Sequence, residues 1–236
     1  DTLFSLYSSR PRIVEYDGVS TFWDSSHIGV WCPSIDTILF AKALDGVLRK
    51  KNDFRSAIEI GCGSGFLSKY LLEKSRKIKS LIINDINQYA IKSAKDNIKD
   101  KRAAYCVGNG IKKIKGKKFD LILCNPPYVP RPKSIDDNPY EGLGILNHLV
   151  HEGQKYLNSN GAIITNVSSL CWSIIFDKKP KMKMTVLDEM DVPLKVNNIL
   201  NNAEWIDYLK TRGLKEENRG GYTYWQKITI IKLENR

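Results

Sequence analysis

Short apolar segments alternate with segments of helical spacing along most of the chain. Between residues 34 and 50, apolar residues recur at every third or fourth position, which predicts a helix. The short apolar runs that follow predict strands buried on both faces, as in a parallel sheet. The predicted strands cover residues 56–60, 79–84, 103–107, 119–124 and 162–167. The helices predicted among and after them cover residues 66–74, 88–98, 144–157 and 203–212.

Three other parts of the chain have different patterns. Residues 222–233 alternate between apolar and polar positions, which predicts a last strand that runs antiparallel in the sheet. The segment 168–202 has no clean period and is interpreted as an insertion, in which residues 186–194 could form a strand. Residues 1–33 hold scattered aromatic side chains and are interpreted as an N-terminal cover over the substrate side, with plain packing as the alternative. The pattern therefore predicts one α/β domain over residues 34–236, with a mostly parallel sheet of seven strands and helices on both faces.

Composition narrows the class of protein. The chain has 236 residues, 42% of them hydrophobic, which is enough for one sizeable core. Its apolar runs are far shorter than the roughly 20 residues of a membrane helix, so no membrane association and a cytoplasmic location are expected. The five cysteines stand singly, without a C-x-x-C pair, so neither a metal site nor a disulfide framework is expected.

The chain is basic. Lys and Arg outnumber Asp and Glu by 37 to 26, and the net charge of +11 favours an anionic partner such as RNA, DNA or an acidic protein. A lysine-rich genome is the alternative explanation of this surplus. Lysines cluster within residues 112–118, where a solvated turn explains them equally well, and within residues 178–183 of the segment interpreted as an insertion.

A glycine-rich turn follows the first predicted strand. Residues 59–65 read E-I-G-C-G-S-G and open directly into a helix, whose first N–H groups are free to bind a ligand. The spacing G-x-G-x-G differs from the G-x-G-x-x-G of dinucleotide sites. Glu59 precedes the glycines and would repel a diphosphate but attract a cationic amino acid group. Asp85 ends the second predicted strand, where its carboxylate can accept hydrogen bonds from both hydroxyls of a ribose.

This combination of a glycine-rich turn and a later acidic strand end resembles the class I S-adenosylmethionine-dependent methyltransferases. The resemblance implies their Rossmann-like fold and S-adenosyl-L-methionine as cofactor. It implies that Gly61, Gly63 and Gly65 pass under the cofactor, that Asp85 holds its ribose and that Ile86 packs on its adenine. In many relatives an Asp after the third strand contacts the adenine amine, and here Asn109 stands at that position.

A second motif follows the strand predicted over residues 119–124. It reads Asn125-Pro126-Pro127-Tyr128, and its two prolines stiffen the backbone and leave carbonyl groups free to accept hydrogen bonds. A planar NH2 group has two donors, which the Asn125 side-chain oxygen and the Pro126 carbonyl could each satisfy. Tyr128 could stack on the planar group. The nitrogen lone pair would then face the methyl group, and no strong base is required because the proton can leave after transfer.

N-P-P-Y after a strand of such a sheet is similar to the motif of amino-directed methyltransferases. These act on adenine N6, on guanine N2 or, in the HemK/PrmC type, on glutamine. The continuation into N-P-P-Y-V-P and the segment W-C-P-S-I-D-T at residues 31–37 look most like the HemK/PrmC type. The similarity spans residues 30–167. Two departures are the missing N-terminal helical domain of that family and a shortened Gly-rich segment, Y-E-G-L-G, at residues 140–144.

Several functions stay open from the sequence. The resemblance implies an N-methyltransferase, and we place first a protein glutamine as its substrate, for instance in a translation factor. An RNA or DNA nucleobase is the alternative, with phosphates bound by Lys and Arg and one base swung out onto Tyr128. A non-catalytic binding subunit and a methyltransferase of small amines are further alternatives. The sequence does not predict the oligomeric state.

Overall fold

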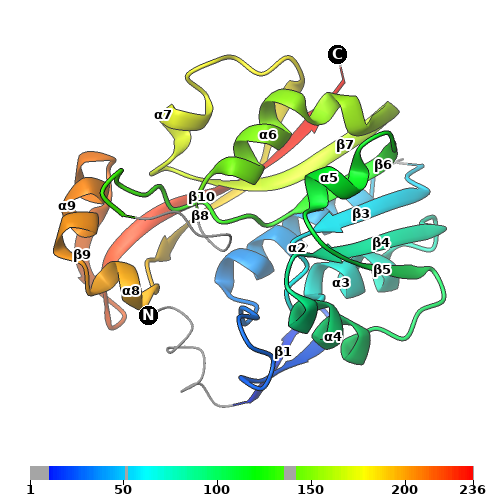
Figure 1. Ribbon diagram of the computed structural model, residues 1–236, viewed down its shortest axis with the longest axis horizontal. Coiled ribbons are helices and arrows are strands. Elements are labelled where there is room, and N and C mark those ends of the chain that lie inside the picture. The colour runs from blue at the N-terminus through cyan, green and yellow to red at the C-terminus, as the bar shows by residue number, and fades with distance from the viewer. Residues whose placement is uncertain (1–10, 51–52, 136–141, 236) are drawn as a thin grey trace.

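The structure is a computed structural model that describes residues 11–50, 53–135 and 142–235. It has three layers, with a central sheet between two layers of helices (Figure 1). The α/β architecture expected from the sequence is therefore confirmed. Within the described ranges, no helix combines the length and the apolar character needed to cross a membrane.

The central sheet is mixed and has eight strands within the described residues. Seven of them lie in the order β5-β4-β3-β6-β7-β10-β8, and β9 pairs with β10. Their bounds are β3 (Ser56–Ile60), β4 (Ser80–Asp85), β5 (Ala103–Val107), β6 (Phe119–Cys124), β7 (Leu157–Ser168), β8 (Lys183–Pro193), β9 (Lys215–Arg219) and β10 (Tyr222–Glu234). In this order, the strands from β5 to β7 run parallel, and β10 runs antiparallel to its three partners β7, β8 and β9. The antiparallel last strand is confirmed, and the sheet has one strand more than the seven predicted.

The additional strand is β9, which the hydrophobic pattern does not reveal because all five of its side chains are exposed. It forms a hairpin with β10 through Gly220 and Gly221. Both glycines have a positive φ, of +58° and +81°, which a tight hairpin turn requires and which glycine adopts without strain. The Gly-Gly pair was thus the sequence signal for this strand.

Helices cover both faces of the sheet. They are α2 (Ile35–Leu48), α3 (Phe66–Lys74), α4 (Gln88–Asn97), α5 (Gly110–Ile114), α6 (Gly144–Glu152), the 3-10 helix η1 (Gly153–Tyr156), α7 (Trp172–Ile175), α8 (Asn197–Leu200) and α9 (Ala203–Thr211). Three asparagines cap helices, because the side chains of Asn87, Asn109 and Asn202 accept backbone N–H bonds at the starts of α4, α5 and α9.

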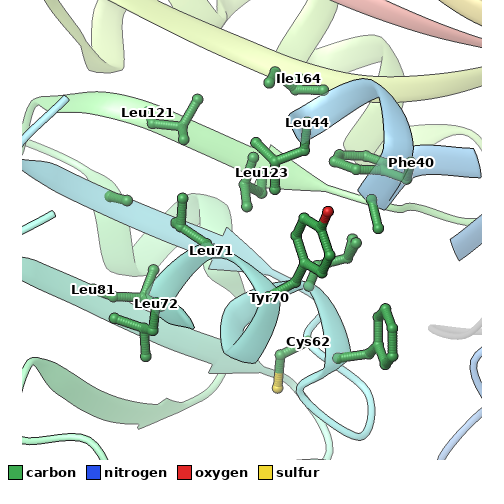
Figure 2. Packing of buried hydrophobic residues seen from close by; sticks show 14 of the residues in the cluster. Phe40, Leu44, Cys62, Tyr70, Leu71, Leu72, Leu81, Leu121, Leu123 and Ile164 are labelled. Atoms are coloured by element: carbon green, nitrogen blue, oxygen red, sulfur yellow. The ribbon is translucent and has the colours of Figure 1, made fainter. Parts of the chain in front are cut away.

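The core has two halves because successive side chains of a strand point to opposite faces of the sheet. On β6, Leu121 and Leu123 pack toward α2 and α3, whereas Ile122 packs toward α6. Figure 2 shows the first half, in which Tyr70 of α3 and Phe40 of α2 lie against these strands. Both rings are fully buried. The face that carries α2 and α3 is called the α2 face below.

The segment 168–202 contains α7, β8 and α8. β8 pairs with β10 from Lys183 to Pro193, so this part of the segment, which includes most of the 186–194 strand, belongs to the sheet. Near the N-terminus, β1 (Arg12–Tyr16) and β2 (Val19–Trp23) form a hairpin against α3 and α4. That residues 1–33 cover the substrate side stays a prediction, and residues 1–10 lie outside the described residues.

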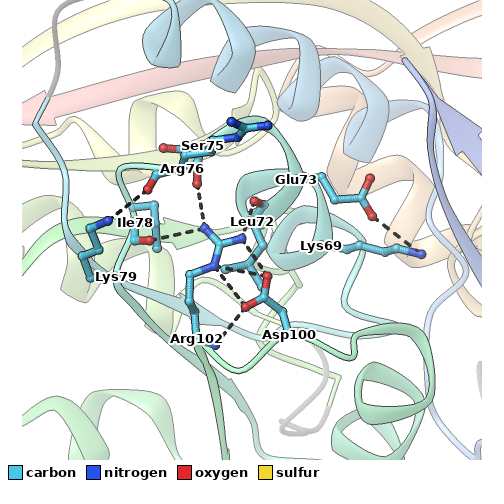
Figure 3. Close-up of polar contacts among 9 residues, drawn as sticks. All are labelled: Lys69, Leu72, Glu73, Ser75, Arg76, Ile78, Lys79, Asp100 and Arg102. Atoms are coloured by element: carbon cyan, nitrogen blue, oxygen red, sulfur yellow. Dashed lines mark hydrogen bonds and ion pairs between the residues drawn. The ribbon is translucent and has the colours of Figure 1, made fainter.

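One arginine joins several loops at the end of the sheet where the parallel strands begin. The Arg102 guanidinium donates to the carbonyl oxygens of Leu72 and Ser75, at 2.7 and 2.8 Å, and forms an ion pair with Asp100 (Figure 3). It also donates to the Ile78 carbonyl at 3.3 Å. These bonds satisfy carbonyls at the C-terminus of α3 and fix the chain that enters β5.

Candidate active site

The glycine-rich turn between β3 and α3 depends on backbone conformations that favour glycine. Gly61, Gly63 and Gly65 all have a positive φ, of +75°, +52° and +84°. A Cβ atom on Gly65 would lie 3.0 Å from the Ala94 Cβ, so α3 can approach α4 closely only without a side chain there. A Cβ on Gly61 would meet nothing within 4 Å, so open space borders the first part of the turn.

Asp85 at the end of β4 is bonded to this turn. Its Oδ2 accepts a hydrogen bond from the Gly63 N–H at 3.0 Å, and its Oδ1 accepts from the Asn87 N–H at 2.9 Å. Burial raises the pKa of the Asp85 carboxyl above its ordinary value, and these backbone bonds oppose the rise. Each oxygen keeps acceptor capacity, because an ionised carboxylate has about four lone-pair positions.

Asn84, which the sequence did not suggest, connects two loops of the site. Its carbonyl oxygen accepts from the N–H groups of Gly61 and Cys62, and its side-chain Nδ2 donates to the carbonyls of Cys106 and Gly108, both at 2.9 Å. The side chain is 1% exposed. A polar residue inside an otherwise apolar strand was the signal that could have found it.

The two expected contacts of the adenine are Ile86, directly after β4, and Asn109, two residues after the end of β5. Ile86 is 48% exposed and Val107 is 46% exposed, so apolar surface stands open at these neighbouring strand ends. Asn109 begins α5, where its Oδ1 accepts from the Lys112 N–H at 3.2 Å. The contacts of Ile86 and Asn109 with adenine stay predictions.

Glu59 is turned away from the open side of the turn. Its carboxyl group accepts a short hydrogen bond from the Ser68 hydroxyl of α3, and the residue is 2% exposed. Burial raises the pKa of Glu59 to about 8, although the bonds from Ser68 oppose the rise. A direct contact between Glu59 and a cationic ligand group stays a prediction.

These features fit S-adenosylmethionine. Open space borders Gly61, the Asp85 carboxylate has acceptors left for ribose hydroxyls, and exposed apolar surface at Ile86 matches a flat adenine. The glycines and Asp85 lie together at the carboxyl ends of β3 and β4, which is where ligands bind in open α/β sheets.

The N-P-P-Y motif begins beside the glycine turn. Cys124 at the end of β6 pairs with Ile60 at the end of β3, so Asn125 and Gly61 continue from neighbouring strands. The Asn125 Nδ2 donates to the Asp36 Oδ2 at 3.1 Å and to the Thr37 Oγ1 at 3.4 Å, both in the first turn of α2. Because an ionised carboxylate only accepts hydrogen bonds, this contact fixes which end of the Asn125 amide faces α2.

Tyr128 at the other end of the motif lies close to the same carboxylate. Burial and the negative charge of Asp36 raise the pKa of the Tyr128 phenol well above its ordinary value, so the phenol stays neutral. Asp36 therefore bonds to the first residue of N-P-P-Y and lies near the last. The sequence pointed to W-C-P-S-I-D-T as a similarity but not to this role, since a contact across 89 positions leaves no local pattern.

Asn166 is a second residue that the sequence did not suggest. Its neighbour Thr165 on β7 pairs with Cys124, so Asn166 lies next to Asn125 across the strand pair. Its side chain is on the α2 face, shared with Ile164. Asn166 is 0% exposed, and neither atom of its amide has a hydrogen-bond partner among the described residues. Such a group costs about 1–3 kcal/mol of stability.

The chain was compared with known families and proteins. Residues 27–171 match the family model described as the methyltransferase small domain. A relative from Methanocaldococcus jannaschii, provisionally named a protein N5-glutamine methyltransferase, is 32% identical over 67% of this chain and 80% of its own length. The release factor glutamine methyltransferase of Aquifex aeolicus is 29% identical over 59% of this chain and 55% of its own length. The chain thus spans little more than half of this second relative.

Solved structures share the fold at low sequence identity. The tRNA m1G37 methyltransferase of M. jannaschii has a TM-score of 0.57 and 14% identity, covering 97% of this chain and 56% of that one. The precorrin-6y C5,15-methyltransferase of Geobacter metallireducens has a TM-score of 0.51 and 13% identity, covering 83% of this chain and 87% of that one. These similarities confirm the expected Rossmann-like methyltransferase fold. The chain belongs to the family of the methyltransferase small domain and is a methyltransferase that uses S-adenosylmethionine, as the sequence led us to expect.

Proposed function

We propose that the enzyme methylates the side-chain amide nitrogen of a glutamine in a protein of the translation machinery. The observation that carries the proposal is the orientation of Asn125, whose NH2 end is held by Asp36. The Asn125 Oδ1 is therefore available as an acceptor, and so is the carbonyl of Pro126, which accepts no hydrogen bond from the described residues. Two acceptors side by side match the two donors of a primary amide.

The residues of the chain position the acceptor rather than deprotonate it. S-adenosylmethionine, when bound, supplies an electrophilic methyl group. Asn125 and Pro126 hold the two N–H bonds of the acceptor, and the neutral ring of Tyr128 provides a flat surface for its amide plane. As the new N–C bond forms, positive charge develops on the nitrogen, and the two oxygens stabilise it. One of the two protons then leaves to solvent.

The named relatives support glutamine as the target. The relative from M. jannaschii carries glutamine in its provisional name, and the relative from A. aeolicus is named for release factors. A ribosomal protein uL3 glutamine methyltransferase from Francisella tularensis is 25% identical over 52% of this chain. A substrate of this kind is macromolecular and places the enzyme in the cytoplasm.

A nucleobase NH2 group is the main competitor, and the test separates the two. Methyl groups from radiolabelled S-adenosylmethionine are transferred into a cell extract, and matched samples are treated beforehand with RNase or with protease. We expect protease to abolish the label and RNase to leave it. A synthetic peptide with one glutamine should then accept the methyl group, whereas the same peptide with glutamate should not. Label that disappears only with RNase would contradict the proposal.

The variant Asn125→Ala links the activity to the motif. It removes one of the two acceptors, so we expect methyl transfer to fall about 100-fold or more while cofactor affinity stays unchanged. Calorimetric titration with S-adenosylmethionine and single-turnover methylation of the peptide measure the two quantities separately. Unchanged turnover would remove Asn125 from the mechanism.

A further inference from the structure

The positive charge of the chain is concentrated in one stretch. Residues 86–118 contain ten basic and two acidic residues, which gives +8 of the total of +11. The remaining 203 residues carry 27 basic and 24 acidic residues. A lysine-rich genome would spread lysine along the whole chain, so it does not explain this distribution. The segment 168–202, with five basic and four acidic residues, is almost neutral.

The fold gathers these lysines around one edge of the sheet. β5 is an edge strand, with α4 on the α2 face and α5 on the opposite face (Figure 1). Nine exposed lysines belong to these elements and to the loops beside them, and together they are called the lysine edge. They are Lys92, Lys95, Lys99, Lys101, Lys112, Lys113, Lys115, Lys117 and Lys118.

The lysine edge lacks neutralising partners inside the protein. In the part of the chain that the structure describes, none of the nine lysines forms an ion pair. Elsewhere, lysines commonly do, as in the pairs Lys42–Asp188 at 2.8 Å and Lys210–Glu216 at 2.6 Å. Within residues 86–118, the basic residue that is paired is Arg102, which bonds to Asp100. Unpaired like charges repel one another, so an external polyanion lowers their energy.

We propose that the lysine edge is a docking surface for structured RNA. Lysine is depleted in protein–protein interfaces, whereas interfaces with nucleic acids are much more positively charged. The lysines also extend over both faces of the sheet edge. Duplex DNA, with a persistence length of about 50 nm, follows one face of such a convex edge, but a folded RNA can bend around it. Binding is to phosphates, without recognition of particular bases.

RNA bound at the loop and the turn between these elements leaves the active site free. The loop of residues 98–102 and the turn of residues 115–118 precede β5 and β6, so they lie where the parallel strands begin. The N-P-P-Y motif and the glycine turn follow the opposite ends of these strands. The bound RNA segment therefore anchors the enzyme near its acceptor. The docking itself does not depend on which amide or base the enzyme methylates.

The test compares three triple variants of the full chain, each with three charges fewer. K92Q/K99Q/K101Q and K115Q/K117Q/K118Q change the two sides of the lysine edge, and K178Q/K179Q/K181Q is the matched control in the other basic run. The probe is a fluorescein-labelled RNA hairpin with single-stranded flanks, and fluorescence anisotropy gives its affinity at several salt concentrations. Duplex DNA of the same length and poly-glutamate are the comparison ligands.

We expect the wild-type chain and the control to bind the RNA equally well, more tightly than DNA or poly-glutamate. Each edge variant should bind at least tenfold more weakly. The magnitude of its slope of log K against log salt should fall by up to about 2–3, because each phosphate contact contributes about 0.7–0.9. An equal loss in the control would show a mere effect of net charge and overturn the proposal. Tighter binding of poly-glutamate would assign the surface to an acidic protein, and failure to bind RNA at about 0.15 M salt would also contradict the proposal.

Discussion

Asp36 and Asn125 are 89 positions apart in the sequence, yet the Asn125 Nδ2 donates a hydrogen bond to the Asp36 Oδ2 at 3.1 Å. The carboxylate of Asp36 also lies close to Tyr128. One side chain in the first turn of α2 therefore orients the acceptor amide of the N-P-P-Y motif and adds to the rise in the pKa of its phenol. The helix in front of the glycine turn is for this reason a part of the candidate active site.

Replacing Asp36 should slow methyl transfer without weakening cofactor binding. In Asp36→Ala the Asn125 amide loses its carboxylate partner and can rotate, and misplaced catalytic groups typically cost about 100-fold in rate. Thr37→Val is the graded comparison, because the Thr37 Oγ1 is a weaker partner at 3.4 Å. The kcat for a glutamine peptide and the Kd for S-adenosylmethionine are measured for both variants. A kcat for Asp36→Ala equal to that of the wild type would show that Asn125 does not need this partner.

Asp85 should contribute mainly to cofactor affinity. Asp85→Ala removes a charge-assisted acceptor for the ribose and the bond to the Gly63 N–H, so we expect a loss of about 1.5–3 kcal/mol, roughly 10- to 150-fold in Kd. Asp53→Ala is the control, since it removes an exposed carboxylate that forms an ion pair with Lys77. Isothermal titration with S-adenosylmethionine measures both. Equal affinities of the two variants would refute the ribose role of Asp85.

Glu59 should make the protein less stable as the pH rises. Its pKa is raised from 4.5 to about 8 in the folded state, so between these values the folded protein holds one proton more than the unfolded chain. Its contribution to stability is fully present below about pH 4.5 and is lost as the pH rises through about 8, by at most on the order of 5 kcal/mol.

The variant Glu59→Gln isolates this effect because glutamine is neutral at every pH and can still bond to Ser68. Urea unfolding at about pH 5 and about pH 9 gives the free energy of unfolding at each pH. We expect the difference between the two pH values to shrink in the variant. If wild type and variant lose the same stability, Glu59 is not the group responsible.

We expect the Asn166 side chain to lower the free energy of unfolding and to contribute to turnover. Asn166→Val removes an amide that is buried without partners, so we expect the free energy of unfolding to rise by about 1–3 kcal/mol. Because Asn166 lies next to Asn125 on the α2 face, we also expect turnover to fall.

Thr165→Val is the matched control for Asn166. Thr165 is equally buried and its hydroxyl also lacks a partner, but its side chain points to the opposite face of β7. This variant should gain stability and keep its turnover. Denaturant unfolding and peptide methylation are measured for both variants, and an active, stabilised Asn166→Val would mean that the amide serves no catalytic purpose.

The sequence predicted those parts of the molecule that depend on neighbouring residues. The strands from β3 to β7 each contain a short apolar run, and the two motifs directly follow strands, so their positions could be predicted. The turned-in position of Glu59 and the contacts of Asp36 and Asn84 could not, because they arise from packing between distant segments. The helix predicted over 144–157 ends earlier than expected, since the chain tightens into η1 after Glu152.

The place of β10 in the sheet has a consequence for how the chain folds during synthesis. β10 lies between β7 and β8, and among the described strands β8 pairs with β10 alone, so this pairing waits until residues 222–234 have been made. The strands from β5 to β7 and the residues of the candidate active site all precede residue 169, and they can assemble first. Until β10 arrives, β7 has an open edge and β8 is unpaired, which exposes both to wrong pairing with other chains. The final strand therefore closes the sheet in a late step, after the cofactor half has formed.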